Sequence, residues 1–235
     1  MTRYFSGTID RSRLSLSIPL VFMTDPEAFI RANTRLLCPP LVPEIKLHLA
    51  EESVPIWQKT EEELGEINVP PPYWAFAWAG GQALARYILD NPELVRDRRV
   101  LDLGTGSGLT AIAAMLAGAT RVLASDIDTF ALAAARMNAA ENKVTFENTN
   151  ENLLSSPPGR YDLILAGDLF YERTLAEEVL AFIEAAALGG AVVLIGDPQR
   201  NYFPRGRFTL AAEYQVPVTR ELEDSLIKKT AVWRL

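Results

Sequence analysis

Three closely spaced glycines, Gly104, Gly106 and Gly108, follow the apolar run of residues 100–103. Glycine has no side chain, so the backbone at these positions can come close to a bound molecule. The alanine-rich segment that follows has helical periodicity, and the amide groups at the start of such a helix would face the same molecule. This strand–loop–helix stretch therefore predicts a site for a nucleotide-type ligand.

A carboxylate, Asp126, ends the next apolar run, residues 121–125. Its two oxygens can accept hydrogen bonds from a ribose diol. The glycine pattern is G-x-G-x-G, and Leu109 stands where a dinucleotide fingerprint has its third glycine. This spacing, behind Asp102, resembles the S-adenosylmethionine (SAM) loop of class I, seven-strand methyltransferases. An ordinary strand–helix turn is the alternative interpretation.

This resemblance implies that SAM is the cofactor and that several segments hold it. Asp126 is expected at the ribose, and Asn152 is expected either at the adenine amino edge or in a plain turn. The expected cofactor-binding residues are Trp78, Asp102, Gly104, Thr105, Gly106, Asp126, Ile127 and Asn152.

A third carboxylate, Asp168, follows the apolar run of residues 161–166. Ligands of open α/β sheets bind outside the carboxyl ends of the strands, where the strand order reverses. The runs at 100–103 and 161–166 are expected to flank that point, so Asp168 is expected to face the transferring methyl group. Capping of the following helix is the alternative role.

Aromatic residues follow a proline-rich entry to the same region. Residues 70–72 are prolines, which forbid a regular helix, and Trp74, Phe76 and Trp78 come directly after them. Rings beside a cofactor loop can enclose an adenosyl group or a substrate amine. Burial of the same rings in the core is the alternative.

The composition argues against other classes of function. The chain has 235 residues, a formal net charge of −7 and a pI near 4.9. Nucleic-acid binding needs clustered Lys and Arg, and the acidic balance argues against it. One cysteine, Cys38, and one histidine, His48, predict no metal site. No apolar run is long enough to span a membrane, so no membrane partner is expected. We also expect a monomer without a nucleic-acid partner.

The expected elements form an extension and two regions. Residues 1–24 are expected to be a flexible extension, residues 25–68 a helical region, and residues 69–235 a methyltransferase domain. The helical region would contain helices over residues 25–37, from Pro43 through Leu49, and around residues 57–67. Strands are expected at residues 100–103, 121–125, 144–147, 161–166, 191–195, 214–221 and 228–234, with a short helix over 206–213. The expected fold is α/β: a doubly wound, Rossmann-like seven-strand sheet, six strands parallel and one antiparallel, with an N-terminal helical cap.

With these elements placed, residues 25–235 resemble the seven-strand protein-lysine methyltransferases that modify the electron transfer flavoprotein β subunit. The resemblance rests on segments 71–75, 80–84, 100–104, 124–128, 167–171 and 194–198. Within them, Asp168-Leu169-Phe170-Tyr171 matches the D/E-x-x-Y/F pattern of these enzymes. Adenine- and glutamine-amino methyltransferases carry N/D-P-P-Y/F at these positions. This chain has Leu169 and Phe170 where those enzymes have the two prolines, which argues against methylation of a base or of glutamine. A more distant similarity is to the ribosomal protein L11 methyltransferases.

The resemblance implies methyl transfer from SAM to lysine side chains of the flavoprotein β subunit, with ribosomal proteins as an open second substrate. Asp168 would be catalytic, accepting a hydrogen bond from the lysine ammonium and helping it lose a proton. Trp74, Phe170 and Tyr171 would line the lysine channel. Residues 1–24 do not form the mitochondrial presequence expected of animal members, so a cytoplasmic, bacterial-type member is expected. A small-molecule N-methyltransferase and a non-catalytic SAM-binding module are the alternatives.

Overall fold

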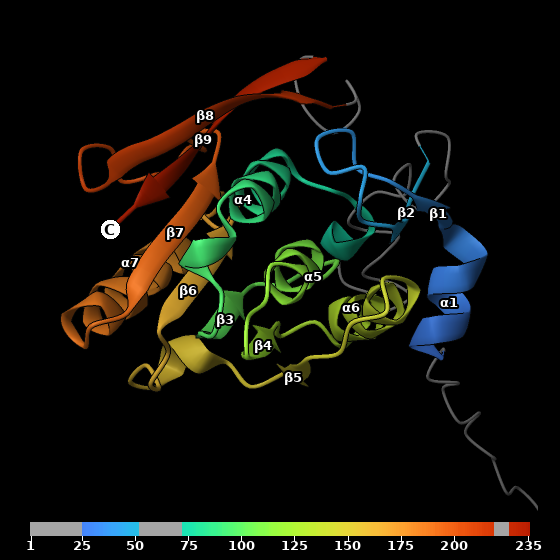
Figure 1. Ribbon diagram of the computed structural model, residues 1–235, viewed down its shortest axis with the longest axis horizontal. Helices are drawn as coiled ribbons and strands as arrows, with labels where there is room; N and C mark the ends of the chain where they lie inside the picture. Colours follow the sequence, from blue (N-terminus) through green and yellow to red (C-terminus); the bar gives the residue numbers. More distant parts are fainter. Residues whose placement is uncertain (1–24, 52–71, 219–225) are drawn as a thin grey trace, which may run out of the picture.

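A seven-stranded sheet forms the centre of the computed structural model, which describes residues 25–51, 72–218 and 226–235 (Figure 1). Its strand order is β5-β4-β3-β6-β7-β9-β8. The strands are β3 (Arg99–Leu103), β4 (Arg121–Ser125), β5 (Glu147–Thr149), β6 (Leu163–Gly167), β7 (Val192–Asp197), β8 (Thr209–Pro217) and β9 (Ile227–Arg234).

The directions of the strands confirm the expected doubly wound sheet. Strands β5, β4, β3, β6 and β7 pair in parallel. Strand β9 runs antiparallel to both β7 and β8, so β8 has the direction of the parallel strands. The expected short helix over residues 206–213 is wrong, because Thr209 already pairs with Arg234 at the start of β8.

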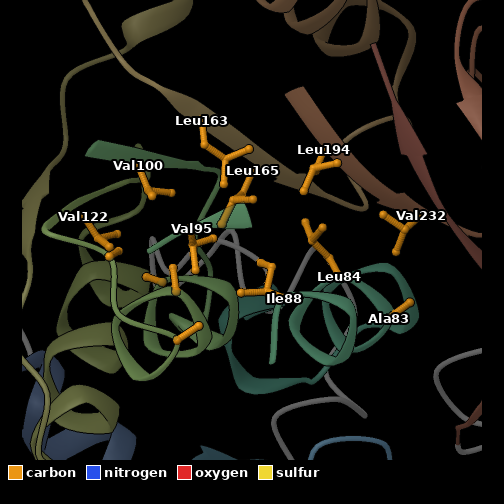
Figure 2. Close-up of a cluster of buried hydrophobic side chains, with 14 of the residues drawn as sticks. Ala83, Leu84, Ile88, Val95, Val100, Val122, Leu163, Leu165, Leu194 and Val232 are labelled. Atoms are coloured by element: carbon orange, nitrogen blue, oxygen red, sulfur yellow. The ribbon is translucent and has the colours of Figure 1, made fainter. Parts of the chain in front are cut away.

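Helices cover both faces of the sheet. The helices of the described chain are α1 (Pro26–Asn33), α4 (Ala79–Asp90), α5 (Leu109–Leu116), α6 (Thr129–Glu141) and α7 (Arg173–Leu188), with the 3-10 helices η1 (Tyr73–Ala75), η2 (Pro92–Leu94) and η3 (Leu153–Ser155). Helix α1 packs against α6. Helices α4 and α5 pack on one face and α7 on the other. Figure 2 shows Leu84 and Ile88 of α4 opposite Leu163, Leu165 and Leu194 of the sheet.

Alternation along each central strand supplies both of these cores. Val100 of β3 packs toward α4 and α5, whereas Leu101 and Leu103 pack toward α7. Successive side chains of a strand point to opposite faces, so a strand covered by helices on both sides is apolar throughout. Because these strands are parallel, their carboxyl ends lie at one edge of the sheet, where polar residues follow them.

The N-terminal region differs from the expected helical region. Helix α1 begins as expected, with the Asp25 carboxylate accepting a hydrogen bond from the Glu27 amide at 3.1 Å. Its expected extent through residue 37 is wrong, because the helix ends at Asn33 and residues 35–37 form a strand. The expected helix from Pro43 through Leu49 is wrong, because β2 (Leu47–Leu49) pairs antiparallel with β1 (Arg35–Leu37). The expected helix around residues 57–67 and the extension of residues 1–24 lie outside the described residues.

The physical reason for this difference is a two-residue alternation. Leu47 and Leu49 are buried and His48 between them is half-buried, which is the pattern of a strand and not of a helix. Helix α6 also holds β2, since the Asn138 side-chain oxygen accepts a hydrogen bond from the His48 amide at 2.7 Å. A partner 90 residues away in the sequence therefore decides the local structure.

No helix within the described ranges has the length and hydropathy needed to cross a membrane. The cytoplasmic location and the monomeric state stay predictions.

Candidate active site

A cavity of about 350 Å³ opens at the carboxyl ends of β3, β4 and β6. Strand β3 lies between β4 and β6, so the cavity is at the point where the strand order reverses, as ligand sites of open α/β sheets are. The lining residues that matter for its chemistry are Tyr73, Trp74, Trp78, Gly104, Asp126, Ile127, Asn152, Asp168, Tyr171 and Arg200.

The glycine loop forms one wall of this cavity. Gly104 lines it with φ +64°, and a Cβ there would lie 2.6 Å from the Leu169 side chain. Gly108 caps helix α5 with φ +81°, and a Cβ there would lie 3.0 Å from the Cβ of Ala135. These φ values favour glycine, and a Cβ at either position would also crowd its neighbour. Bare backbone therefore faces the cavity at Gly104, while Thr105 and Gly106 stand behind it.

Asp102 is buried behind the loop and does not line the cavity. Its carboxylate accepts hydrogen bonds from the hydroxyls of Thr105 and Thr110 and from the Ala111 amide. Burial raises the pKa of Asp102 to about 6, against the effect of these donors. Asp102 thus fixes the loop to the start of helix α5, and its expected role in cofactor binding stays a prediction.

Asp126 lies on the cavity wall at the end of β4. Its carboxylate accepts hydrogen bonds from the amides of Gly106 at 2.9 Å and Asp128 at 3.0 Å. Burial raises the pKa of Asp126, and these amides lower it. Two amides hold the carboxylate from the protein side, which fixes its direction for a diol on the cavity side.

Ile127 and Asn152 complete this side of the cavity. Ile127 lines it and is 73% exposed, so its apolar side chain is available to a planar ring. Asn152 also lines it, and its side-chain oxygen accepts a hydrogen bond from the Leu154 amide at 3.1 Å as the cap of η3. The turn role expected for Asn152 is therefore present, beside its position on the cavity wall.

Asp168 lies on the opposite side, directly after β6, with φ +59° and 7% exposure. One of its oxygens accepts hydrogen bonds from Nε of Arg200 at 2.9 Å and Nη2 of Arg200 at 2.7 Å. The other accepts from the Gly81 amide at 2.8 Å. Helix α7 is capped by Glu172 and not by Asp168, so the alternative role as a helix cap is wrong.

Arg200 is the main site residue that the sequence reasoning missed. Its guanidinium pairs with Asp168 and lies over the Trp78 ring at 5.3 Å from the centroid. The Asp197 carboxylate at the end of β7 accepts a hydrogen bond from the Arg200 amide at 2.7 Å. The available signal was the position of Asp197 after an apolar run, because neighbouring parallel strands end at the same edge.

Aromatic rings line the same cavity as Asp168. Trp74 is buried and Trp78 is half-buried, and both line the cavity. Tyr73 and Tyr171 are each 44% exposed, with their ring centroids 5.6 Å apart. Tyr73 was not singled out from the sequence, although it adjoins Trp74 in the aromatic-rich stretch.

Phe170 is not part of this wall, contrary to the expectation that it lines a lysine channel. It is fully buried, with its ring 5.5 Å from that of Phe203 and 6.2 Å from that of Phe208. The turn after β6 directs neighbouring side chains to opposite sides, so Tyr171 reaches the cavity and Phe170 the core under α7.

In the described part of the chain, no three His, Cys, Asp or Glu side chains come together as a metal ion would require. The site offers carboxylates, aromatic rings, an arginine and bare backbone. That combination suits an organic ligand with hydroxyl and amino groups, and a second, cationic or amine-bearing group beside it.

Comparisons with known proteins agree with this interpretation. The family model of ribosomal protein L11 methyltransferase (PrmA) matches residues 82–189. The electron transfer flavoprotein beta subunit lysine methyltransferase of Danio rerio is 40% identical over 217 residues, covering 89% of this chain and 83% of the relative. Its Homo sapiens counterpart is 37% identical over 218 residues, covering 89% and 82%. A solved ribosomal protein L11 methylase from Lactobacillus delbrueckii subsp. bulgaricus has 26% identity and a TM-score of 0.47, covering 67% of this chain and 79% of that one.

The Danio rerio and Homo sapiens matches each cover more than four fifths of both chains, and the family model spans the glycine loop, Asp126 and Asp168. The protein is thus a methyltransferase. This chain belongs to the family of electron transfer flavoprotein beta subunit lysine methyltransferases.

Proposed function

We propose that this enzyme transfers methyl groups from SAM to lysine side chains of the electron transfer flavoprotein β subunit. The names of its relatives support this substrate. The observation that carries the proposal is a single cavity with Asp126 on one wall and Asp168 on another. In this proposal Asp126 binds the ribose of SAM, and Asp168 binds the amine of the substrate.

The residues of one wall fit the cofactor. The bare backbone of Gly104 leaves room for the methionine part, and Asp126 is oriented to accept the ribose hydroxyls. Ile127 supplies an apolar surface for the adenine ring, and Asn152 lies nearby with a polar edge. Bound SAM would supply a methyl group on a positively charged sulfur.

The residues of the other wall fit the substrate amine. A free lysine has a pKa of about 10.4, so roughly one molecule in a thousand carries the neutral, reactive amine at neutral pH. Asp168 can accept a hydrogen bond from the nitrogen and direct its lone pair. The rings of Tyr73, Trp78 and Tyr171 can enclose the side chain and tolerate a methylated, cationic nitrogen.

The test is methyl incorporation into purified electron transfer flavoprotein β subunit. We expect the intact mass of the subunit to rise by whole methyl groups with SAM and the wild-type enzyme, and peptide mapping to locate them on lysines. The matched control is Asp168→Asn, which removes the carboxylate and keeps the size of the side chain. Methylation of small amines with no change in the subunit's mass would overturn the proposal.

A further inference from the structure

Arg200 lines the cavity, and its guanidinium is held by neighbouring side chains. It donates two hydrogen bonds to one oxygen of Asp168, at 2.9 and 2.7 Å, and it lies over the Trp78 ring. The Arg200 side chain is 17% exposed and that of Asp168 is 9% exposed. A partly desolvated pair of this kind is electrostatically stronger than a pair on the surface.

The backbone that carries Arg200 is fixed as well. The Asp197 carboxylate is fully buried and accepts the Arg200 amide at 2.7 Å, and Gln199 between them has φ +62°. A tight turn at the end of β7 therefore directs Arg200 toward Asp168. Burial, together with the neighbouring charge of Asp168, raises the pKa of Asp197 to about 7.

The arginine changes what Asp168 does to an incoming lysine. An unpaired carboxylate stabilises an ammonium ion and raises its pKa, which lowers the share of the reactive amine. A fixed positive charge on the same carboxylate opposes this effect. The wall then orients the nitrogen without trapping it in the unreactive form.

We propose that Arg200 is a positioning residue that neutralises Asp168, so that the site takes the substrate amine in its neutral, reactive form. This inference rests on the proposed lysine methylation. Arg200 would determine the protonation state of the substrate lysine, whereas Asp168 would orient its nitrogen.

Other titratable groups face the same cavity and belong in any account of its pH dependence. Tyr73 and Tyr171 lie beside the pair, and burial raises the pKa of Tyr171. Asp126, Asp128, Glu151 and Glu178 line the cavity on other elements. Burial raises the pKa of Asp128 to about 6, so Asp128 titrates below the range in which a lysine amine loses its proton.

The test is the dependence of kcat on pH for Arg200→Gln at saturating SAM and flavoprotein β subunit. A charge within ~5 Å at an effective dielectric constant of about 20 shifts a pKa by roughly two units, so the alkaline midpoint should rise by about one to two pH units. At pH 7 kcat should fall by roughly 10- to 100-fold, because each unit of midpoint shift reduces the neutral fraction tenfold. The KM for the subunit should not rise in Arg200→Gln, since Asp168 without its partner charge favours binding of the lysine as the ammonium ion.

Three further variants keep the test decisive. Arg200→Lys retains the charge and should retain the wild-type midpoint. Arg200→Met keeps an unbranched apolar side chain without the charge and replaces Arg200→Gln if that variant does not fold. The matched control is Arg173→Gln, because Arg173 also lies over a ring, that of Tyr202 at 5.4 Å, but does not line the cavity.

An unchanged midpoint in folded Arg200→Gln, with kcat lowered equally at every pH, would overturn the inference. So would a rise of tenfold or more in the SAM Kd by calorimetry, which would make Arg200 a cofactor ligand. Failure of the proposed function looks different, because the wild-type enzyme would then transfer no methyl group to the subunit at any pH.

Discussion

Alanine substitutions at two adjacent glycines at the start of helix α4 should change the stability of the protein in opposite directions. A Cβ on Gly80 would lie 2.1 Å from the backbone oxygen of Gly196 on β7 and 2.6 Å from a carboxylate oxygen of Asp168. A Cβ on Gly81 would meet the Leu109 side chain at 3.9 Å, which is an ordinary contact. The substitution Gly80→Ala therefore pushes a helix away from the sheet, and Gly81→Ala does not.

The magnitudes follow from these contacts. A backbone oxygen cannot rotate away, so we place Gly80→Ala at the upper end of the overpacking range, about 3 kcal/mol of lost stability. A chain of this size loses roughly 2–4 °C of Tm per kcal/mol, which gives a fall of about 6–12 °C. Gly81→Ala should gain roughly 0.5–1 kcal/mol from the higher helix propensity of alanine, which raises the Tm by about 1–4 °C.

Thermal unfolding followed by circular dichroism measures both variants under one set of conditions. We also expect Gly80→Ala to lose more activity than its stability explains at a temperature where it is folded, because the new methyl group displaces the Asp168 carboxylate. Equal Tm values for the two alanine variants would refute the packing of α4 against β7 described above.

Three further predictions concern the charged groups of the site. Asp168→Asn should lower kcat by about 100-fold or more while the SAM Kd by calorimetry stays within a few-fold, and near-normal turnover would remove Asp168 from the mechanism. Asp126→Ala should weaken SAM binding by roughly 10- to 100-fold, since hydrogen bonds to a charged group are lost, and an unchanged affinity would contradict its ribose role. The pKa of Asp197 is raised from 3.8 to about 7 in the folded state, so its contribution to stability is present below about pH 4 and is lost as the pH rises through 7. Asp197→Asn should therefore flatten the fall in Tm between pH 5 and 7, and a slope as steep as in the wild type would contradict the burial of a titrating carboxyl group.

Short-range patterns were enough to identify the sheet and the cofactor side of the site. The loop at Gly104 and the carboxylate of Asp126 follow apolar strands, and strands of a parallel sheet end at one edge. Their position on a common cavity follows from that rule and from the backbone freedom of glycine. The expectation that the runs at 100–103 and 161–166 flank the switch point is confirmed by the pairing of β3 with β6.

The direction of individual side chains depended on contacts distant in the sequence. Phe170 and Tyr171 are adjacent aromatic residues, and only the turn after β6 sends one into the core and the other to the cavity. Leu47 and Leu49 form a strand because β1 and Asn138 of α6 supply its hydrogen-bond partners. Local propensity alone cannot provide such partners.

The sequence by itself determined the class of enzyme, because the residues expected to bind the cofactor lie within a few positions of recognisable strands. Only the tertiary structure decided that Asp168 works beside Arg200, since 32 residues and one complete helix separate the two in the chain. An ion pair across adjacent strand ends arises from the closing of the sheet, and no spacing in a linear sequence specifies it.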